Sequence, residues 1–302
     1  MDTPERRGNS PLAVVSVFAV VVAGALGLAV APRLELTRQV EGRAVAAAPI
    51  EADPASGEPE GNRPRSVYRL GDHPLLTSDR RLAAVTCELP AFGTGDEELA
   101  AFYRAGVVCL DRAWEPVLAE AGLPFATPEL NTGPELADGP CGAAPSADEA
   151  VAYYCGSNRT VYMPTARLRA PGGGGDRASS HLATLAHEYG HHVQALAGVL
   201  RAGNRRIAEA GETDPAGLEM SRRLELQANC FAGLFLAAAS GRGSVGTGLA
   251  EDAVDDFRYA IAEPPERNSH GSPGNQDAWA RAGFGGGTSA CNTFTAGAAE
   301  VG

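Results

Sequence analysis

Apolar side chains recur at helical spacing along four stretches of the chain. These stretches predict helices at Asp96–Ala121, Arg177–Leu200, Asp214–Ser240 and Leu249–Ile261. One short run before the second helix, Arg159–Met163, is instead rich in β-branched and aromatic residues and predicts a strand. The pattern therefore predicts an α+β fold that is mainly helical and carries a small β-sheet.

The longest apolar run lies near the N-terminus, where residues 12–31 are almost all Val, Ala, Leu, Gly and Phe. A run of about 20 such residues is long enough to cross a bilayer. Arg6 and Arg7 precede it, which favours a transmembrane anchor in the cell membrane with residues 1–11 in the cytoplasm. A signal peptide cleaved after Ala29-Val30-Ala31, giving a secreted protein, is the alternative, although the length of the run favours the anchor. Under either interpretation the rest of the chain lies outside the cytoplasm.

The segment after this run differs in composition from the rest of the chain. Residues 32–65 are rich in Ala, Pro, Glu, Gly and Arg and show little periodicity, so they predict a flexible linker. Residues 66–302, about 235 in number, suffice for one substantial domain with its own core.

Six cysteines form an even set in this exported region, which favours disulfide bonds over buried free thiols. Six cysteines allow fifteen pairings. Short separations suggest two of the bonds, which leaves the last two cysteines for each other. The expected pairs are Cys87 with Cys109, Cys141 with Cys155, and Cys230 with Cys291.

The chain is acidic, with a formal net charge of −12, and all 25 of its basic residues are arginine. Nucleic-acid binding needs a positive surface, so we expect no nucleic-acid partner. The densest late acidic cluster, Glu251, Asp252, Asp255 and Asp256, predicts one solvated helix face.

The stretch His187-Glu188-Tyr189-Gly190-His191 lies in the second predicted helix. Its two histidines are one turn apart on the same face, so both imidazoles can bind one metal ion. Glu188 can reach a water molecule that the metal holds. This is the H-E-x-x-H pattern of zinc hydrolases, in which the glutamate is the general base. The alternative is a surface helix that carries polar residues by chance.

A catalytic zinc site needs a third protein ligand. The extended motif that supplies a third histidine is excluded, because Gln194 and Ala197 stand at its glycine and histidine positions. The alternative is a carboxylate from a later helix. Glu225 is the best candidate, because it lies in an otherwise apolar segment where an unpaired carboxylate is costly. Glu219 and Glu209 are weaker candidates, because their neighbours are more polar.

Several motifs follow one another along the chain in a fixed order. They are His187-Glu188-Tyr189-Gly190-His191-His192-Val193-Gln194, Glu225-Leu226-Gln227-Ala228-Asn229-Cys230-Phe231-Ala232-Gly233, His270-Gly271 and Cys291-Asn292-Thr293-Phe294, with Cys141-Gly142, Tyr154-Cys155 and Thr160-Val161-Tyr162 in the middle section. Together they resemble the neutral zinc metallopeptidase family found in bacteria, and the similarity runs from about Val67 to Phe294. The resemblance implies a zincin-like fold, zinc bound by His187, His191 and Glu225, and Glu188 as catalytic base.

Two positions depart from the family pattern. The family usually has aspartate where this chain has Asn229, and a carboxylate there would accept the ring N–H of a zinc-binding histidine. Asparagine can accept through its carbonyl oxygen but brings no charge, so we expect weaker zinc binding. After His270-Gly271, the expected glutamine-arginine pair reads Asn275-Gln276, so a positive charge is missing.

The ligand set implies a mechanism. Zinc lowers the pKa of its water to roughly 7, Glu188 takes the proton, and zinc with one protein donor stabilises the oxyanion. His270 is the candidate for that donor, while a structural or surface role for it stays equally open. An exposed edge of the Arg159–Met163 strand could pair with an extended substrate.

Two classes of function follow. The first is a membrane-anchored zinc metallopeptidase that cleaves proteins or peptides outside the cytoplasm. The second is a non-catalytic, zinc-stabilised binding module that keeps the fold. The intact Glu188 favours the enzyme, because a binding module has no need of a general base.

Overall fold

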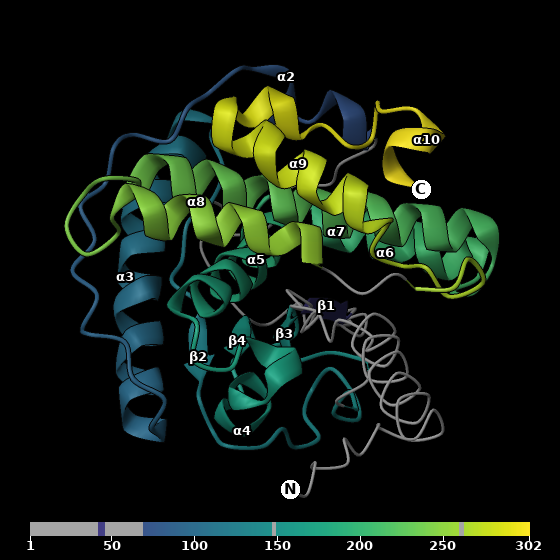
Figure 1. Cartoon of the computed structure of the whole chain (residues 1–302). Coiled ribbons are helices and arrows are strands. Elements are labelled where there is room, and N and C mark those ends of the chain that lie inside the picture. Colours follow the sequence, from purple (N-terminus) through teal and green to yellow (C-terminus); the bar gives the residue numbers. More distant parts are fainter. Residues whose placement is uncertain (1–41, 46–68, 147–148, 260–262) are drawn as a thin grey trace, which may run out of the picture. The chain divides into compact units, whose positions relative to one another are not determined.

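The computed structural model describes residues 42–45, 69–146, 149–259 and 263–302. They form many helices and one small sheet (Figure 1), which confirms the prediction of a mainly helical α+β fold. None of the helices in these described ranges is long and apolar enough to cross a membrane. The predicted anchor at 12–31 and the N-terminal segment 1–11 lie outside the described residues.

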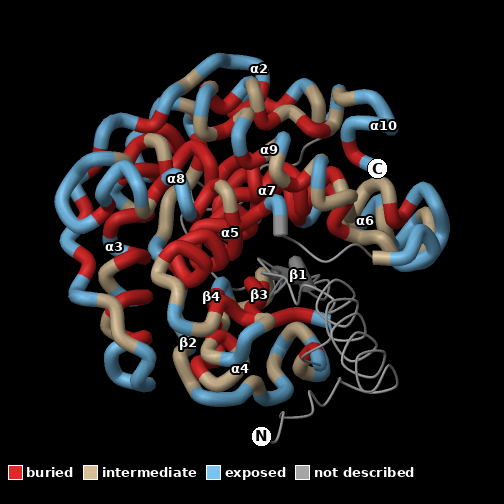
Figure 2. The backbone as a smooth tube through the Cα atoms, in the orientation of Figure 1, coloured by how far each residue is buried: buried red, intermediate tan, exposed pale blue. Residues whose placement is uncertain are grey.

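Two long helices form the centre of the core. They are α5 (Ala178–Leu196) and α7 (Pro215–Ala239), which pack against each other and are buried over most of their length (Figure 2). Helix α9 (Pro273–Gly285) packs along α7, while α8 (Thr247–Asp255) and α3 (Asp96–Glu120) pack against α5. A helix that is covered on all sides can be apolar around its circumference, as the last part of α7, Cys230–Ala239, is.

Shorter helices complete the described chain. They are α2 (Pro74–Thr77), α4 (Thr165–Arg169), α6 (Val199–Ala210) and α10 (Ala298–Val301), together with the 3-10 turns η2 (Leu70–Asp72), η3 (Pro171–Gly173), η4 (Asp256–Tyr259) and η5 (Thr288–Cys291).

The predicted helix Arg177–Leu200 is two helices. Helix α5 ends at Leu196 and α6 begins at Val199, because Gly198 between them has a φ of +76°, a conformation that glycine adopts without strain. The prediction Leu249–Ile261 is wrong at its end, since α8 stops at Asp255 and continues as a 3-10 turn.

The sheet has the strand order β1-β3-β4-β2 and lies beside α5. Strand β3 (Ala152–Cys155) is antiparallel to β4 (Thr160–Tyr162), and β1 (Gly42–Val45) and β2 (Glu129–Asn131) add in parallel on the outer sides. Strand β4 is therefore paired on both sides, and the expectation that it offers an exposed edge to a substrate is wrong. Strand β1 lies inside the segment 32–65 that composition predicts to be a linker.

All three expected disulfide bonds are present, which confirms the pairing suggested by the separations. Cys87–Cys109 joins a loop to α3, and Cys141–Cys155 joins a loop to β3. Cys230–Cys291 joins α7 to η5 across a separation of 61 residues.

Candidate metal centre

The centre forms where α5 crosses α7. Gly190 marks the point of closest approach, because a Cβ atom on it would lie 2.9 Å from the carbonyl oxygen of Ala228 on α7. The glycine therefore permits a helix crossing that any larger residue would push apart. The crossing brings His187 and His191 of α5 against Glu225 of α7.

Three atoms converge at this crossing, and all three residues are buried. Nε2 of His187 and Nε2 of His191 are 3.1 Å apart, and Oε2 of Glu225 lies 3.3 Å from the first and 3.1 Å from the second. Tetrahedral zinc with bonds of about 2.0–2.1 Å would hold neighbouring ligand atoms about 3.3 Å apart. The triangle therefore has the size of one face of a zinc tetrahedron.

The other ring nitrogens face side-chain amides. Nδ1 of His187 lies 2.7 Å from Oδ1 of Asn229, and Nδ1 of His191 lies 2.9 Å from Oε1 of Gln194. An amide oxygen only accepts, so each Nδ1 carries the proton and each neutral ring turns the lone pair of Nε2 toward Glu225. Three electron-pair donors facing one another repel unless a cation lies between them. The donor set thus fits zinc.

Charge in the centre is distributed unevenly. Burial lowers the pKa of His187. Burial acts in the same direction on His191, but Glu225 outweighs it and raises the pKa of that imidazole. Burial acts against the charged form of Glu225 too, but His191 and His187 outweigh it and hold the pKa of Glu225 well below its usual range. Glu225 is therefore a carboxylate and not a carboxylic acid, which is the form that binds a metal ion.

Glu188 is fully buried, and its carboxyl group interacts electrostatically with His191, Glu225 and His270. Neither of its carboxylate oxygens accepts a hydrogen bond from a side chain among the described residues. Burial raises its pKa to about 8 against the opposite effects of His191, His270 and the backbone of Tyr154. A buried carboxylate without a partner is costly, and such groups in native proteins call for a functional explanation.

His270 also lies at the centre and is buried, so a surface role is excluded. Its Nε2 is 3.9 Å from Oε2 of Glu225, and its Nδ1 lies 3.2 Å from Oε2 of Glu263. Gly271 follows with a φ of +86°, which turns the chain sharply before α9. Gln276 donates to the carbonyl of Gly271 and fixes this turn.

The remaining histidines of the motif helix are buried and hydrogen-bonded, and neither belongs to the triangle. His181 lies against the hydroxyl of Tyr103, and His192 against the hydroxyl of Tyr154. Burial lowers the pKa of each imidazole to about 4.

The other candidate carboxylates lie elsewhere. Glu219 pairs with Arg223, and Glu209 with Arg205, both on the same helix as their partner. Neither belongs to the group of metal-binding side chains found in the described residues. Asp256, expected on a solvated face, is buried and accepts a hydrogen bond from the hydroxyl of Ser180.

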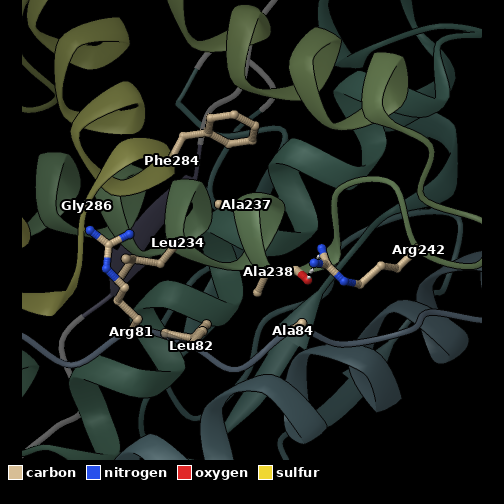
Figure 3. Close-up of a pocket in the computed structure, with 9 residues that line it drawn as sticks. All are labelled: Arg81, Leu82, Ala84, Leu234, Ala237, Ala238, Arg242, Phe284 and Gly286. Carbon is tan, nitrogen blue, oxygen red and sulfur yellow. Dashed lines mark hydrogen bonds between the residues drawn. The ribbon is translucent and has the colours of Figure 1, made fainter.

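A pocket of about 170 Å³ lies away from the centre (Figure 3). Helix α7 contributes Leu234, nine residues beyond Glu225, which corresponds to about 14 Å along the helix axis. Arg81 and Arg242 lie at its two sides. No metal-centre residue lines this pocket.

Comparison with known proteins identifies the family. The family described as "Putative neutral zinc metallopeptidase" matches residues 77–294. The uncharacterized protein YpfJ of Escherichia coli (strain K12) is 28% identical over 215 residues, 66% of this chain and 72% of that protein. The uncharacterized protein Rv2575 of Mycobacterium tuberculosis (strain ATCC 25618 / H37Rv) is 30% identical over 216 residues, 62% of this chain and 68% of that protein. No solved structure matches the chain. Because the match covers most of the chain, this protein belongs to the family of neutral zinc metallopeptidases, and its metal cofactor is zinc.

Proposed function

We propose that the protein is a zinc-dependent peptidase that hydrolyses peptide bonds of proteins or peptides outside the cytoplasm. His187, His191 and Glu225 bind the zinc ion, and Glu188 is the general base. One observation carries the proposal. The buried carboxylate of Glu188 has no side-chain hydrogen-bond partner among the described residues, and it interacts electrostatically with His191 and Glu225, two of the three residues whose donor atoms are spaced as zinc ligands.

When bound, zinc supplies a Lewis acid that activates water near neutral pH and polarises a carbonyl group. Glu188 accepts the proton of the attacking water and passes it to the leaving amine. Its burial suits both steps, because a carboxyl with a raised pKa holds a proton well enough to deliver it again.

His270 donates a hydrogen bond to the oxyanion through Nε2. The carboxylate of Glu263 lies against Nδ1 and can only accept, so Nδ1 carries a proton. Nε2 is therefore a donor only when the ring holds both protons. Glu263 stabilises that charged ring, and His270 in turn helps to hold the pKa of Glu263 below its usual range, against the opposite effect of burial.

We place the catalytic domain outside the cytoplasm, anchored by residues 12–31 through the linker 32–65. Three disulfide bonds support this location, because such bonds persist in oxidising compartments. The apolar run and the two arginines before it support the anchor.

The test compares wild type with Glu188→Gln on an unstructured protein such as casein, with zinc content measured for each. The variant should bind zinc and lose activity by at least about 100-fold, since general-base catalysis is worth that much. Glu209→Gln, an exposed change on α6, is the matched control and should keep wild-type turnover. Equal turnover in wild type and Glu188→Gln would refute the assignment of the base.

A zinc-stabilised binding module is the second candidate. The ligand set, with Asn229 accepting from His187, suffices to hold a zinc ion whether or not turnover follows, so it is compatible with this role too. Stoichiometric zinc in the wild type without cleavage of any unstructured protein would select this function.

A further inference from the structure

The second histidine of the metal centre is held by a chain of amides. Oε1 of Gln194 lies 2.9 Å from Nδ1 of His191, and Nε2 of Gln194 donates to Oε1 of Gln227 at 3.1 Å. Nε2 of Gln227 donates in turn to the carbonyl of Cys291 at 3.1 Å. Both glutamines are fully buried, so water does not compete for these bonds.

The direction of this chain is determined by its far end. The carbonyl of Cys291 only accepts, so the amino group of Gln227 must face it and Oε1 of Gln227 must face Gln194. The amino group of Gln194 meets a second acceptor, the carbonyl of Leu224, at 2.8 Å. With both of its donors used, Gln194 can present only its oxygen to His191.

An oxygen at that position has one consequence for the imidazole. In the neutral ring that binds a metal ion, Nδ1 of His191 must carry the proton, and Nε2 is left with a lone pair aimed at Nε2 of His187 and at Glu225. The far end of the chain is itself anchored, because Cys291 is bonded to Cys230 on α7.

We propose that Gln194 is a positioning residue that fixes the tautomer and orientation of His191 for zinc binding, with Gln227 holding Gln194 in place. The inference rests on the proposed zinc ligands and not on peptidase turnover. It assigns a role to two fully buried glutamines.

Zinc affinity, measured by competition with a chromophoric chelator, tests the role directly. Gln194→Met keeps the volume but removes the acceptor, and it should weaken zinc binding 10- to 100-fold, roughly the range for such supporting partners. Gln227→Met leaves Gln194 held by Leu224 and should weaken zinc binding less than Gln194→Met does.

Gln194→Glu separates positioning from a structural role. Its carboxylate still accepts from Nδ1 of His191 but no longer donates to Leu224 or Gln227. The metal-free variant should therefore melt at a lower temperature than wild type, while its zinc affinity stays at or above the wild-type value. If Gln194 had only a structural role, Gln194→Glu would lower the melting temperature and the zinc affinity together.

Thr165→Val is the matched control, since Thr165 is also buried and its side chain donates a hydrogen bond, to Oδ1 of Asp96, but it lies on α4, which contributes no residue to the metal centre. It should lower the melting temperature without changing zinc affinity. The proposal is overturned if Gln194→Met binds zinc as tightly as Thr165→Val does. It is also overturned if Gln194→Glu binds zinc more weakly than wild type. If Gln194→Met does not fold, the zinc affinity of Gln194→Glu alone tests the proposal. Because no substrate is used, an inactive wild type that binds zinc leaves these outcomes unchanged.

Discussion

Gly190→Ala adds one methyl group between the two helices that carry the proposed ligands. The new Cβ atom would lie 2.9 Å from the carbonyl oxygen of Ala228, 3.0 Å from its Cα and 3.2 Å from its Cβ. Two of these three atoms are backbone, so no flexible side chain can turn aside. Either α5 or α7 must shift by a few tenths of an ångström.

Two opposing effects set the size of the change. Alanine favours a helix over glycine by about 1 kcal/mol, which would stabilise α5. Forcing a methyl group into a packed core costs about 1–3 kcal/mol. We expect the second effect to dominate, with a net loss of about 1 kcal/mol in the free energy of unfolding. Zinc affinity should fall as well, because ligand atoms 3.1–3.3 Å apart on two helices separate when the helices do.

Denaturant unfolding of the zinc-free protein and chelator competition measure the two losses. The control is Gly248→Ala in α8, where a Cβ atom would meet nothing within 4 Å. This variant gains the helix propensity alone, so it should be no less stable than wild type and should bind zinc equally well. If Gly190→Ala behaves like Gly248→Ala in both assays, the close crossing at Ala228 is refuted.

Asn229→Asp should tighten zinc binding, because a carboxylate polarises the ring of His187 more strongly than an amide; equal affinities in chelator competition would contradict this. Replacing Cys230 and Cys291 by serine should lower the free energy of unfolding by about 4 kcal/mol, because this disulfide closes a loop of 61 residues. Replacing Cys141 and Cys155, which close a loop of 14 residues, should lower it by about 3 kcal/mol. Equal losses in denaturant titrations would argue against the loop-entropy explanation. Acid should destabilise the zinc-free protein. Burial lowers the pKa of His181 and of His192 to about 4 in the folded protein, whereas the pKa of a histidine in the unfolded chain is near 6.5. Between these values the unfolded chain binds protons that the folded protein does not bind. These contributions are complete above pH 6.5, and each falls by up to about 1.4 kcal/mol per unit as the pH drops toward 4. A His181→Gln variant that keeps the wild-type pH slope would refute this.

The helical period explains why the sequence could bring together the residues of the metal centre. Residues four apart on a helix share a face, so the spacing of His187 and His191 determines their geometry once a helix forms. A lone carboxylate in an apolar helix needs a partner, and Glu225 finds one in the two imidazoles. The sequence could also predict the disulfides, because two of the separations are short.

The pairing of the strands could not be predicted from the sequence. The composition of β4 identifies it as a strand, but its neighbours β2 and β3 come from other parts of the chain, and nothing in five residues says on how many sides they pair. The prediction that the acidic cluster forms one solvated helix face was wrong at Asp256 for a related reason. Helical spacing places Asp252 and Asp256 on one face, but α8 becomes a 3-10 turn at Asp256, which directs that carboxylate inward to Ser180.

The hydrogen bonds that orient the zinc-binding histidines could be predicted only in part, because they depend on residues far apart in the sequence. Gln194 is three residues from His191, so its reach to Nδ1 follows from the helix alone. Its orientation does not, because that depends on Leu224 and Gln227, which face it only where α7 crosses α5. A glycine inside a helix indicates that something packs closely against it, but it does not say which element does. The sequence therefore predicts α5 and α7 separately, but only their crossing at Gly190 brings the ligands of the two helices together in one zinc site.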